Sequence, residues 1–259
     1  MLRKRIIARL DIKGPNVIKG VHLECLRKVG DPQQLSTKYY NDGIDEILYI
    51  DVVASLYGRK NLTQIVKRAS ENIFVPLTVG GGVRSIEDIN ELLRSGADKI
   101  AINSHLIQHP DFVDNAAKRF GSQCIVGSIE AKRKGNAWEP FYNNGREPSH
   151  KNVLVWAKEL VDRGVGELLI TSIDQEGTCR GFDIELMKKI STAVNVPVIA
   201  SGGAGNLEDI EEVISSGGAD AVAIAHLLHY GKLNIKEIKN VRKIFRENTM
   251  LRVPGEAHL

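Results

Sequence analysis

The sequence has few cysteines, few aromatic residues and little net charge. Its 259 residues include three cysteines, Cys25, Cys124 and Cys179, and none stands at a spacing typical of a metal site or a disulfide framework. Aromatic residues make up 5% of the chain, and 35 basic against 32 acidic residues leave a net charge of +3. This near balance, without a stripe of interleaved basic and aromatic residues, argues against nucleic acid as a partner. We expect free thiols, no metal and no other cofactor.

Long hydrophobic runs are also missing. No apolar stretch approaches the ~20 residues that a transmembrane helix needs. The N-terminal residues are basic, but the apolar run after them is interrupted by Arg9 and Asp11, unlike the core of a secretory signal peptide. We therefore expect a cytoplasmic protein without a membrane partner.

The sequence does contain an internal repeat. The segment Leu77–Ile89 resembles Val198–Ile210, which aligns Gly81 with Gly202 at an offset of 121 residues. Three further pairs of segments continue the pattern: Ile6–Asp11 with Ile125–Glu130, Asp45–Ile50 with Gly166–Thr171, and Gly96–Ser104 with Gly218–His226. The repeat predicts two homologous halves, each of four βα units.

The pattern of elements predicts an α/β protein, a (β/α)₈ TIM barrel. Apolar runs alternate with amphipathic stretches of helical period, which indicates a parallel sheet. Strands are expected near 5–10, 46–51, 75–79, 99–103, 124–129, 167–172, 197–200 and 221–225, and helix N-caps at Ser85 and Asn206. A single barrel runs to about 250 residues. We therefore expect one domain over 1–259, with half-barrels at about 1–122 and 123–247 and a loose tail at 248–259.

One longer insertion, Ala131–Pro148, carries Gly, Asn and Pro. It is expected to form an excursion over one face of the barrel, with Trp138 packed at its surface.

Two glycine loops mark the expected site, because barrel active sites lie at the C-terminal ends of the strands. Gly80–Gly82 follows the third expected strand and Gly202–Gly205 the seventh, and each runs into a helix start, which suits a phosphate. The neighbouring loops contribute Asn103, Ser104, Ala225 and His226. Two such sites on opposite rims predict a substrate with a phosphate at each end. Turn glycines without a ligand are the alternative interpretation.

Acidic residues follow several of the expected strands. Asp11 and Glu130 are repeat-equivalent and should face each other, where two carboxyls can act as acid and base if their pKa values differ. A pair of solvated strand-end acids is the alternative. Asp51 ends the second expected strand, and Asp174 begins the loop after the sixth, where Asp174–Thr178 can order a rim loop and bind substrate hydroxyls. For Gln175 and Glu176, which follow Asp174, an ordinary role in the loop is at least as good an interpretation.

Charged residues open four of the strands at the opposite end: Arg5, Glu46, Lys99 and Glu167. Two cations and two anions can form a balanced ring that closes a pore. The pattern by itself favours ordinary surface charge at strand starts.

Several motifs carry a resemblance to a known family: Arg5–Asp11, Val79–Gly82, Gly96–Lys99, Ile102–Ser104, Thr171–Asp174 and Ala200–Gly205. Over nearly the whole chain the sequence resembles HisF, the cyclase subunits of imidazole glycerol phosphate synthase in histidine biosynthesis. The resemblance implies that a HisH-type glutaminase docks on the bottom of the barrel and that its ammonia passes through to the top. There the ammonia attacks a bis-phosphorylated ribulosyl aminoimidazole carboxamide ribonucleotide. The products are imidazole glycerol phosphate and an aminoimidazole carboxamide ribonucleotide.

The resemblance also implies roles for single residues. Asp11 and Glu130 would be the acid–base pair, and the four charges at the strand starts would gate the ammonia path. Lys19 would lie on a mobile loop after the first strand, and Asp98 and Gln123 at the glutaminase interface. The substrate- and phosphate-binding residues would be Lys19, Asp51, Thr78, Gly81, Gly82, Asn103, Ser104, Thr171, Asp174, Gly177, Ser201, Gly202, Gly203, Ala225 and His226.

Three residues depart from the family pattern. Glu130 stands where the family has Asp, His226 where a serine helps to hold the second phosphate, and Arg9 where a small residue is usual. By strand alternation Arg9 points into the barrel below Asp11. It would need Asp11 or Glu130 as a partner, would lower that partner's pKa, and could obstruct the ammonia path.

These departures leave two other interpretations open. One is a HisF-like paralogue that supplies ammonia for sugar amidation in surface-polysaccharide biosynthesis. The other is the sister isomerase HisA, against which the charged strand starts and the Thr171–Asp174 loop speak.

Overall fold

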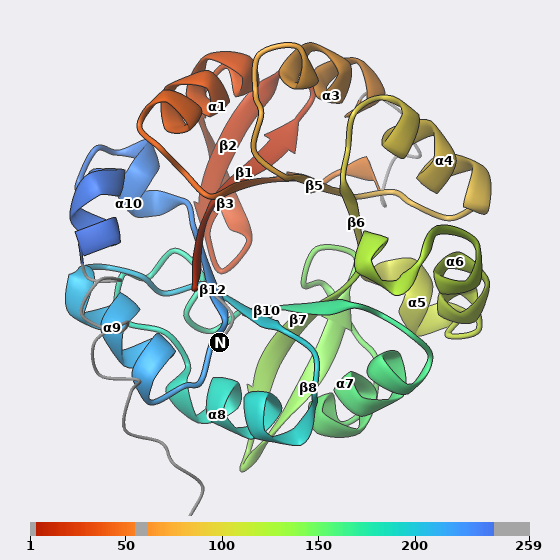
Figure 1. The fold of residues 1–259 in the computed structure, drawn as a ribbon. Coiled ribbons are helices and arrows are strands. Elements are labelled where there is room, and N and C mark those ends of the chain that lie inside the picture. The colour runs from red at the N-terminus through yellow and green to blue at the C-terminus, as the bar shows by residue number, and fades with distance from the viewer. Residues whose placement is uncertain (1–3, 55–61, 241–259) are drawn as a thin grey trace, which may run out of the picture.

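Residues 4–54 and 62–240 are described by the computed structural model. Eight parallel strands in this part of the chain close into a barrel, and helices surround it (Figure 1). The order around the barrel is β1, β4, β5, β6, β7, β10, β11 and β12, and the pairing of β12 with β1 and of β7 with β10 completes the circle. The predicted (β/α)₈ barrel is therefore confirmed. The tail expected at 248–259 lies outside the described residues.

The barrel strands lie where the apolar runs predicted them, to within a few residues. They are β1 (Arg5–Lys13), β4 (Glu46–Asp51), β5 (Leu77–Gly80), β6 (Lys99–Ile102), β7 (Ile125–Lys134), β10 (Glu167–Ser172), β11 (Val198–Ser201) and β12 (Ala221–Ile224). The helices include α1 (Pro32–Asn41), α3 (Leu62–Ser70), α4 (Ile86–Arg94), α5 (Ser104–Gln108), α6 (Phe112–Phe120), the 3₁₀ turn η1 (Ser122–Cys124), α7 (Val153–Asp162), α8 (Ile184–Ala193), α9 (Leu207–Ser215) and α10 (His226–His229). No helix of the described ranges is both long and apolar enough to cross a membrane.

The repeat produces the same helix start twice. Before α4 the Ser85 side chain accepts from the N–H of Asp88, and the Asp88 carboxylate accepts from the N–H of Ser85. Asn206 and Asp209 form the same capping box before α9. Each box satisfies two helix-terminal N–H groups. The two predicted caps are confirmed, and they fix the point at which each glycine loop becomes a helix.

Inward-facing side chains fill the barrel in layers. Because side chains alternate along a strand, Arg5, Ile7, Arg9 and Asp11 of β1 all point inward. The middle layer is an apolar cluster of Ile7, Leu48, Ala101, Val126, Leu169, Ile199, Ala221 and Ala223. It separates the charged residues at the strand starts from the polar residues at the strand ends.

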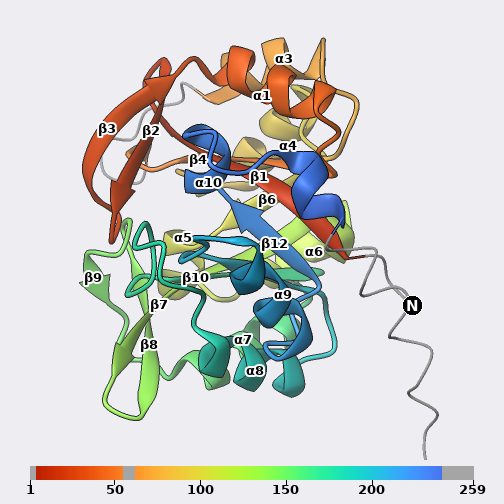
Figure 2. The same cartoon turned by 90° about the vertical axis from the view of Figure 1, so that its left-hand side faces the viewer.

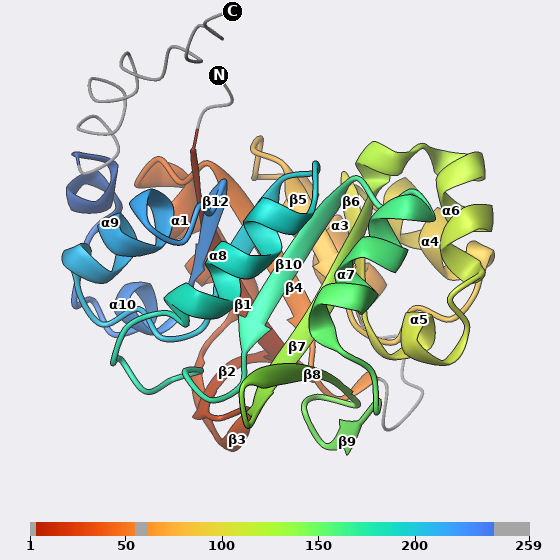
Figure 3. The same ribbon diagram turned by 90° about the horizontal axis from the view of Figure 1, so that it is seen from below.

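Two barrel strands continue beyond the barrel as antiparallel arms. β1 continues into β2 (Asn16–Val21) and β3 (Glu24–Gly30), which we call the first arm. β7 continues into β8 (Ala137–Tyr142) and β9 (Glu147–Pro148), the second arm. Both arms project from the end at which the barrel strands finish, which we call the mouth (Figures 2 and 3).

The second arm is the excursion expected for the insertion Ala131–Pro148, whereas the first arm was not predicted. The expectation that Trp138 packs at the surface was wrong. Trp138 is 2% exposed, and its indole Nε1 donates to Asp183 Oδ2 at 2.8 Å. The guanidinium of Arg133 lies 4.2 Å from the centre of the indole ring and covers it.

Candidate active site

Asp11 and Glu130 occupy equivalent points in the two halves, each where its strand leaves the barrel for its arm. Asp11 pairs with a residue of β4 on one side and of β2 on the other, and Glu130 pairs with residues of β10 and β8. Both residues are buried, with 5% and 9% relative exposure. Two solvated strand-end acids therefore do not describe this pair.

Arg9 takes Asp11 as its partner. Its Nε donates to Asp11 Oδ1 at 2.9 Å, and its Nη1 donates to Thr171 Oγ1 at 2.8 Å and to Ser201 Oγ at 3.0 Å. Burial opposes the ionisation of Asp11, but the charges of Arg9 and Lys19 and the hydrogen bond from Arg9 outweigh it, so the pKa of Asp11 lies below its ordinary value. Asp11 is therefore ionised at neutral pH.

Glu130 is shifted in the opposite direction. Burial raises the pKa of Glu130 to about 7. The charge of Arg9 and the N–H of Gly145, which donates to Glu130 Oε2 at 2.7 Å, offset this rise only in part, and the charge of Asp11 adds to it. Near neutral pH one carboxyl of the pair is ionised while the other is about half protonated. Such a pair can supply an acid and a base at the same pH.

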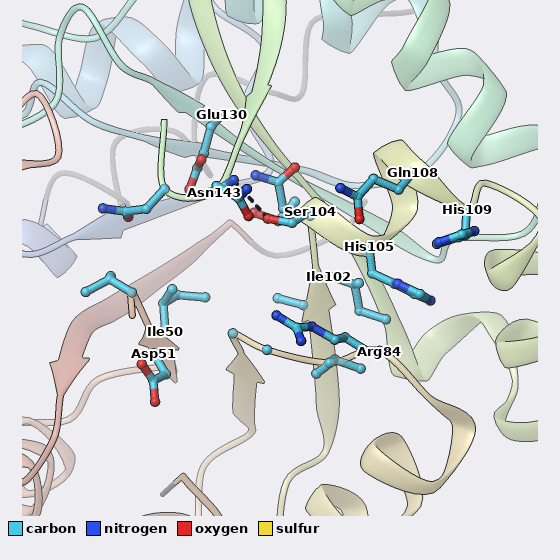
Figure 4. Close-up of a pocket in the computed structure, with 18 residues that line it drawn as sticks. Ile50, Asp51, Arg84, Ile102, Ser104, His105, Gln108, His109, Glu130 and Asn143 are labelled. Atoms are coloured by element: carbon cyan, nitrogen blue, oxygen red, sulfur yellow. Dashed lines mark hydrogen bonds between the residues drawn. The ribbon is translucent and has the colours of Figure 1, made fainter. Parts of the chain in front are cut away.

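The glycine loop after β5 borders a cavity of about 380 Å³, which we call the first cup (Figure 4). Predicted site residues that line it are Asp51, Gly81, Gly82, Asn103, Ser104 and Glu130. Gly81 has a φ of +105°, and a Cβ there would collide with the carbonyl oxygen of Asp51, so the loop needs glycine. The Oδ1 atom of Asn103 is buried without a hydrogen-bond partner in the described part of the chain. It is free to accept from a ligand.

The equivalent cavity after β11 and β12, the second cup, is almost closed. Its volume is only about 20 Å³. It is lined by Gly177, Gly202, Gly203, Ala225 and His226 together with Arg9, Lys19, Ser201 and Glu176. Burial and nearby lysines lower the pKa of His226, and its Nε2 is buried without a partner among the described residues. The two halves thus carry the same kind of loop but unequal space.

Lys19 lies in β2 of the first arm and not on a loop. It forms an ion pair with Glu176, and the two residues are 5% and 3% exposed. Burial lowers the pKa of Lys19 to about 8. The N–H of His22 donates to the carbonyl oxygen of Glu176 at 2.8 Å, and Gly177 packs so close that a Cβ would collide with the Gly20 carbonyl. Glu176 therefore does more than shape its loop, because it holds the first arm against the mouth.

Of three further residues predicted to bind substrate, only one lines a cup at the mouth. Asp51 lines the first cup, and its carboxylate also accepts from two N–H groups of the following turn. Asp174 accepts from the N–H of Arg133 at 2.7 Å, which ties the loop after β10 to the second arm. Thr78 is buried and its hydroxyl donates to Glu46 Oε1 at 2.6 Å, so this side chain lies with the charged strand starts and not at the mouth.

Arg5, Glu46, Lys99 and Glu167 form a closed ring at the end opposite the mouth, which we call the charged ring. Arg5 bonds Glu46 at 2.7 Å and also Glu167, and Lys99 lies 3.1 Å from Glu46 and 2.9 Å from Glu167. The side chains of Glu46 and Glu167 are 1% and 8% exposed. Ordinary surface charge, which the pattern alone favoured, was therefore wrong. Cations and anions alternate and close the barrel beneath the apolar layer.

Loss of one ring charge should destabilise the fold. Glu46→Gln keeps the shape but leaves Arg5 and Lys99 without their shared carboxylate, so we expect a loss of about 3 kcal/mol in the free energy of unfolding. Asp114→Asn is the matched control, because it breaks an exposed 2.7 Å pair with Arg163 and should cost under about 0.5 kcal/mol. Urea unfolding of both variants measures the difference. Equal losses would show that the ring does not stabilise the barrel.

Asp98 and Gln123 lie toward the same end as the charged ring. Asp98 Oδ2 accepts from the N–H of Leu77 in β5, the neighbouring barrel strand, at 2.8 Å. Asp45 and Asp220 likewise accept from a backbone N–H of the strand before them in the barrel. Asp98 therefore has a structural role in the barrel that does not depend on a partner protein. Gln123 is exposed in η1.

The sequence reasoning missed Arg84, Ser128 and Asn143, which line the first cup. Arg84 extends along the cavity directly after the glycine loop, and this position was an available signal (Figure 4). Asn143 comes from the second arm, where its N–H donates to Ser104 Oγ at 3.0 Å, and only the tertiary fold brings it there. Nowhere in the described chain do three His, Cys, Asp or Glu side chains gather as metal ligands would.

The chain matches known proteins of one family over most of its length. Residues 5–234 match a family model described as "Histidine biosynthesis protein". The chain is 57% identical over 210 residues to the imidazole glycerol phosphate synthase subunit HisF of Legionella pneumophila, covering 81% of this chain and 99% of that protein. It is 46% identical to the HisF subunit of Myxococcus xanthus (92% and 94% covered) and 46% identical to that of Trichormus variabilis (93% and 95%).

Proposed function

Because the chain belongs to the HisF family of imidazole glycerol phosphate synthase subunits, we propose that it performs the cyclase reaction of histidine biosynthesis in the cytoplasm. Its substrate is the bis-phosphorylated ribulosyl aminoimidazole carboxamide ribonucleotide. Ammonia attacks this substrate, which yields imidazole glycerol phosphate, an aminoimidazole carboxamide ribonucleotide and one water.

One observation carries this proposal: two repeat-equivalent, buried carboxyls with opposite pKa shifts lie between two glycine cups. The cups take the two terminal phosphates of the substrate, so that its reacting centre lies between Asp11 and Glu130. Ionised Asp11 accepts the proton that ammonia loses as its nitrogen bonds to the substrate. The ammonia nitrogen replaces the ketone oxygen of the ribulosyl group, and protonated Glu130 donates a proton to that oxygen, which departs as water.

The opposite end of the barrel supports a partner. We propose that a HisH-type glutaminase docks there, beside Asp98 and Gln123, and delivers ammonia to the charged ring. The ring opens by exchanging the ion pairs of Arg5 or Lys99, and the apolar layer above it suits a small neutral molecule better than an ion. The interface itself stays a prediction.

A turnover assay tests the proposal. The purified chain is given the bis-phosphorylated substrate with excess ammonium salt at mildly alkaline pH, so that free ammonia is present and no glutaminase is needed. We expect consumption of the substrate with formation of imidazole glycerol phosphate. Absence of both binding and turnover would overturn the proposed function.

One observation favours a second candidate. Arg9 occupies the interior above the apolar layer and engages Asp11, which would suit a barrel that supplies ammonia to a separate sugar amidotransferase in surface-polysaccharide biosynthesis. Tight binding of the bis-phosphorylated substrate without turnover would favour this candidate over the cyclase.

A further inference from the structure

The two halves of the mouth differ at the interior position two residues before each carboxyl residue. Arg9 and Ser128 are equivalent in the repeat, and each stands two residues before its carboxyl residue. Ser128 lines the first cup of about 380 Å³, and Arg9 lines the second cup of about 20 Å³. A guanidinium therefore lines the smaller cup, where the larger cup has a hydroxyl.

Arg9 uses only part of its guanidinium on the protein. Nε holds Asp11 and Nη1 holds Thr171 and Ser201, but the two N–H groups of Nη2 have no acceptor among the residues that the structure describes. Nε and Nη2 form the side edge of the guanidinium, the edge that binds a carboxylate or phosphate through two parallel bonds. Asp11 thus takes only half of that edge, although Arg9 is 3% exposed.

Two further nitrogen-bearing side chains line the same cup. Nε2 of His226 is buried there without a partner in the described chain. Lys19 also lines the cup, with Glu176 as its only ion-pair partner in the described ranges. These three side chains, beside the positive-φ backbone of Gly202 and Gly203, make a surface that is complementary to an anion with several acceptor oxygens.

We propose that Arg9 is the guanidinium ligand of the phosphate group bound in the second cup, and that it releases Asp11 to reach that phosphate. The proposal rests on the proposed function, from which the phosphorylated substrate follows. The side edge of the guanidinium turns from one carboxylate oxygen to two phosphate oxygens, and Thr171 and Ser201 keep Nη1 in place.

This exchange links phosphate binding to the base. While Arg9 holds Asp11, the carboxylate is ionised but weakly basic. Once Arg9 turns to the phosphate, Asp11 loses its nearest cation, and its pKa rises toward the ordinary range. Asp11 then accepts a proton more readily only when the substrate is seated.

Binding of inorganic phosphate, followed by NMR at single backbone amides, tests the exchange without turnover. The amide of Gly203 reports the second cup, and the amide of Gly82 reports the first cup as an internal reference. Arg9→Gln should weaken phosphate binding at Gly203 by about tenfold or more and leave Gly82 unchanged. Asp11→Asn replaces the charged competitor for Arg9 with a neutral amide that holds the guanidinium more weakly, and should tighten binding at Gly203 about fivefold or more. In the Arg9→Gln background the same Asp11→Asn change should act less than about twofold.

Arg163→Gln is the matched control, because it removes one positive charge from the surface ion pairs with Asp114 and Glu159 and should leave Gly203 unchanged. Undiminished binding in Arg9→Gln would overturn the proposal, as would equal losses at Gly203 and Gly82. The proposal would also be overturned if Asp11→Asn tightened phosphate binding at Gly203 equally in the Arg9→Gln background, because loss of the negative charge alone would then explain the effect. If Arg9→Gln leaves Asp11 unpaired and so fails to fold, the double variant Arg9→Gln/Asp11→Asn, which removes both charges, is compared with Asp11→Asn. In that case we expect weaker phosphate binding at Gly203 in the double variant. Failure of the cyclase assay alone would count against the proposed function and not against this assignment.

Discussion

Asp11→Asn should abolish cyclase turnover, with a fall in kcat of about 10²–10⁴-fold. The amide cannot accept the proton that ammonia loses. It keeps an oxygen for Arg9 Nε, and Arg9 keeps its bonds to Thr171 and Ser201, so we expect the barrel to fold. Turnover with saturating ammonium salt, alongside circular dichroism, measures the two effects separately.

The control for this variant is Asp114→Asn, an equal change on the outer surface that should leave kcat within about twofold. Wild-type turnover in a folded Asp11→Asn variant would remove Asp11 from the acid–base pair. Loss of the circular dichroism signal together with activity would mean that Asp11 acts through stability, as the partner of Arg9.

Glu130→Ala should lower kcat by about 10²–10⁴-fold, whereas Glu130→Asp should retain or raise activity. Aspartate keeps a carboxyl at the strand end, and it is the residue that the family pattern has there. Because a displacement of about 1 Å can cost a hundredfold in rate, the aspartate variant tests the placement of the carboxyl as well as its charge. A collapse of Glu130→Asp to the level of Glu130→Ala would show that the site is built around glutamate and a different substrate.

The same group predicts the pH dependence. Burial raises the pKa of Glu130 to about 7, so its acid form is present below that pH and is lost as the pH rises through it. If Glu130 donates the proton, kcat/KM per concentration of free ammonia should fall as the pH rises through about 7. A rise over that interval would instead make Glu130 the base of the reaction.

The sequence predicted the barrel well because two independent signals agreed. Apolar runs located the strands, and the repeat required eight of them. The first arm escaped prediction because its strand Glu24–Gly30 is largely exposed and has no apolar period to detect. What holds this arm in place is tertiary, chiefly the contacts of Lys19 and His22 with Glu176, which lies more than 150 residues away.

The candidate site shows where sequence reasoning ends. Strand alternation placed Arg9 inside the barrel and required a carboxylate for it, but alternation does not set a side-chain rotamer. Only the structure shows that Arg9 pairs with Asp11 and not with Glu130. The charged ring is a similar case. Strand parity showed that its four residues could meet inside the barrel, but only the ion-pair distances in the structure distinguish a ring from ordinary surface charge.

The first arm can have a lower local stability than the barrel that carries it. A two-stranded ribbon is only marginally stable without packing, so the arm can open locally at a cost set by its few contacts, while the barrel stays closed. Two of the hydrogen bonds near its tip end on Glu176, one from the Lys19 ammonium and one from the His22 N–H. The free-energy cost of opening the first arm therefore depends largely on Glu176, a residue outside the proposed acid–base pair. Substitutions at Glu176 can therefore change how often the first arm opens, while Asp11 and Glu130 stay as they are.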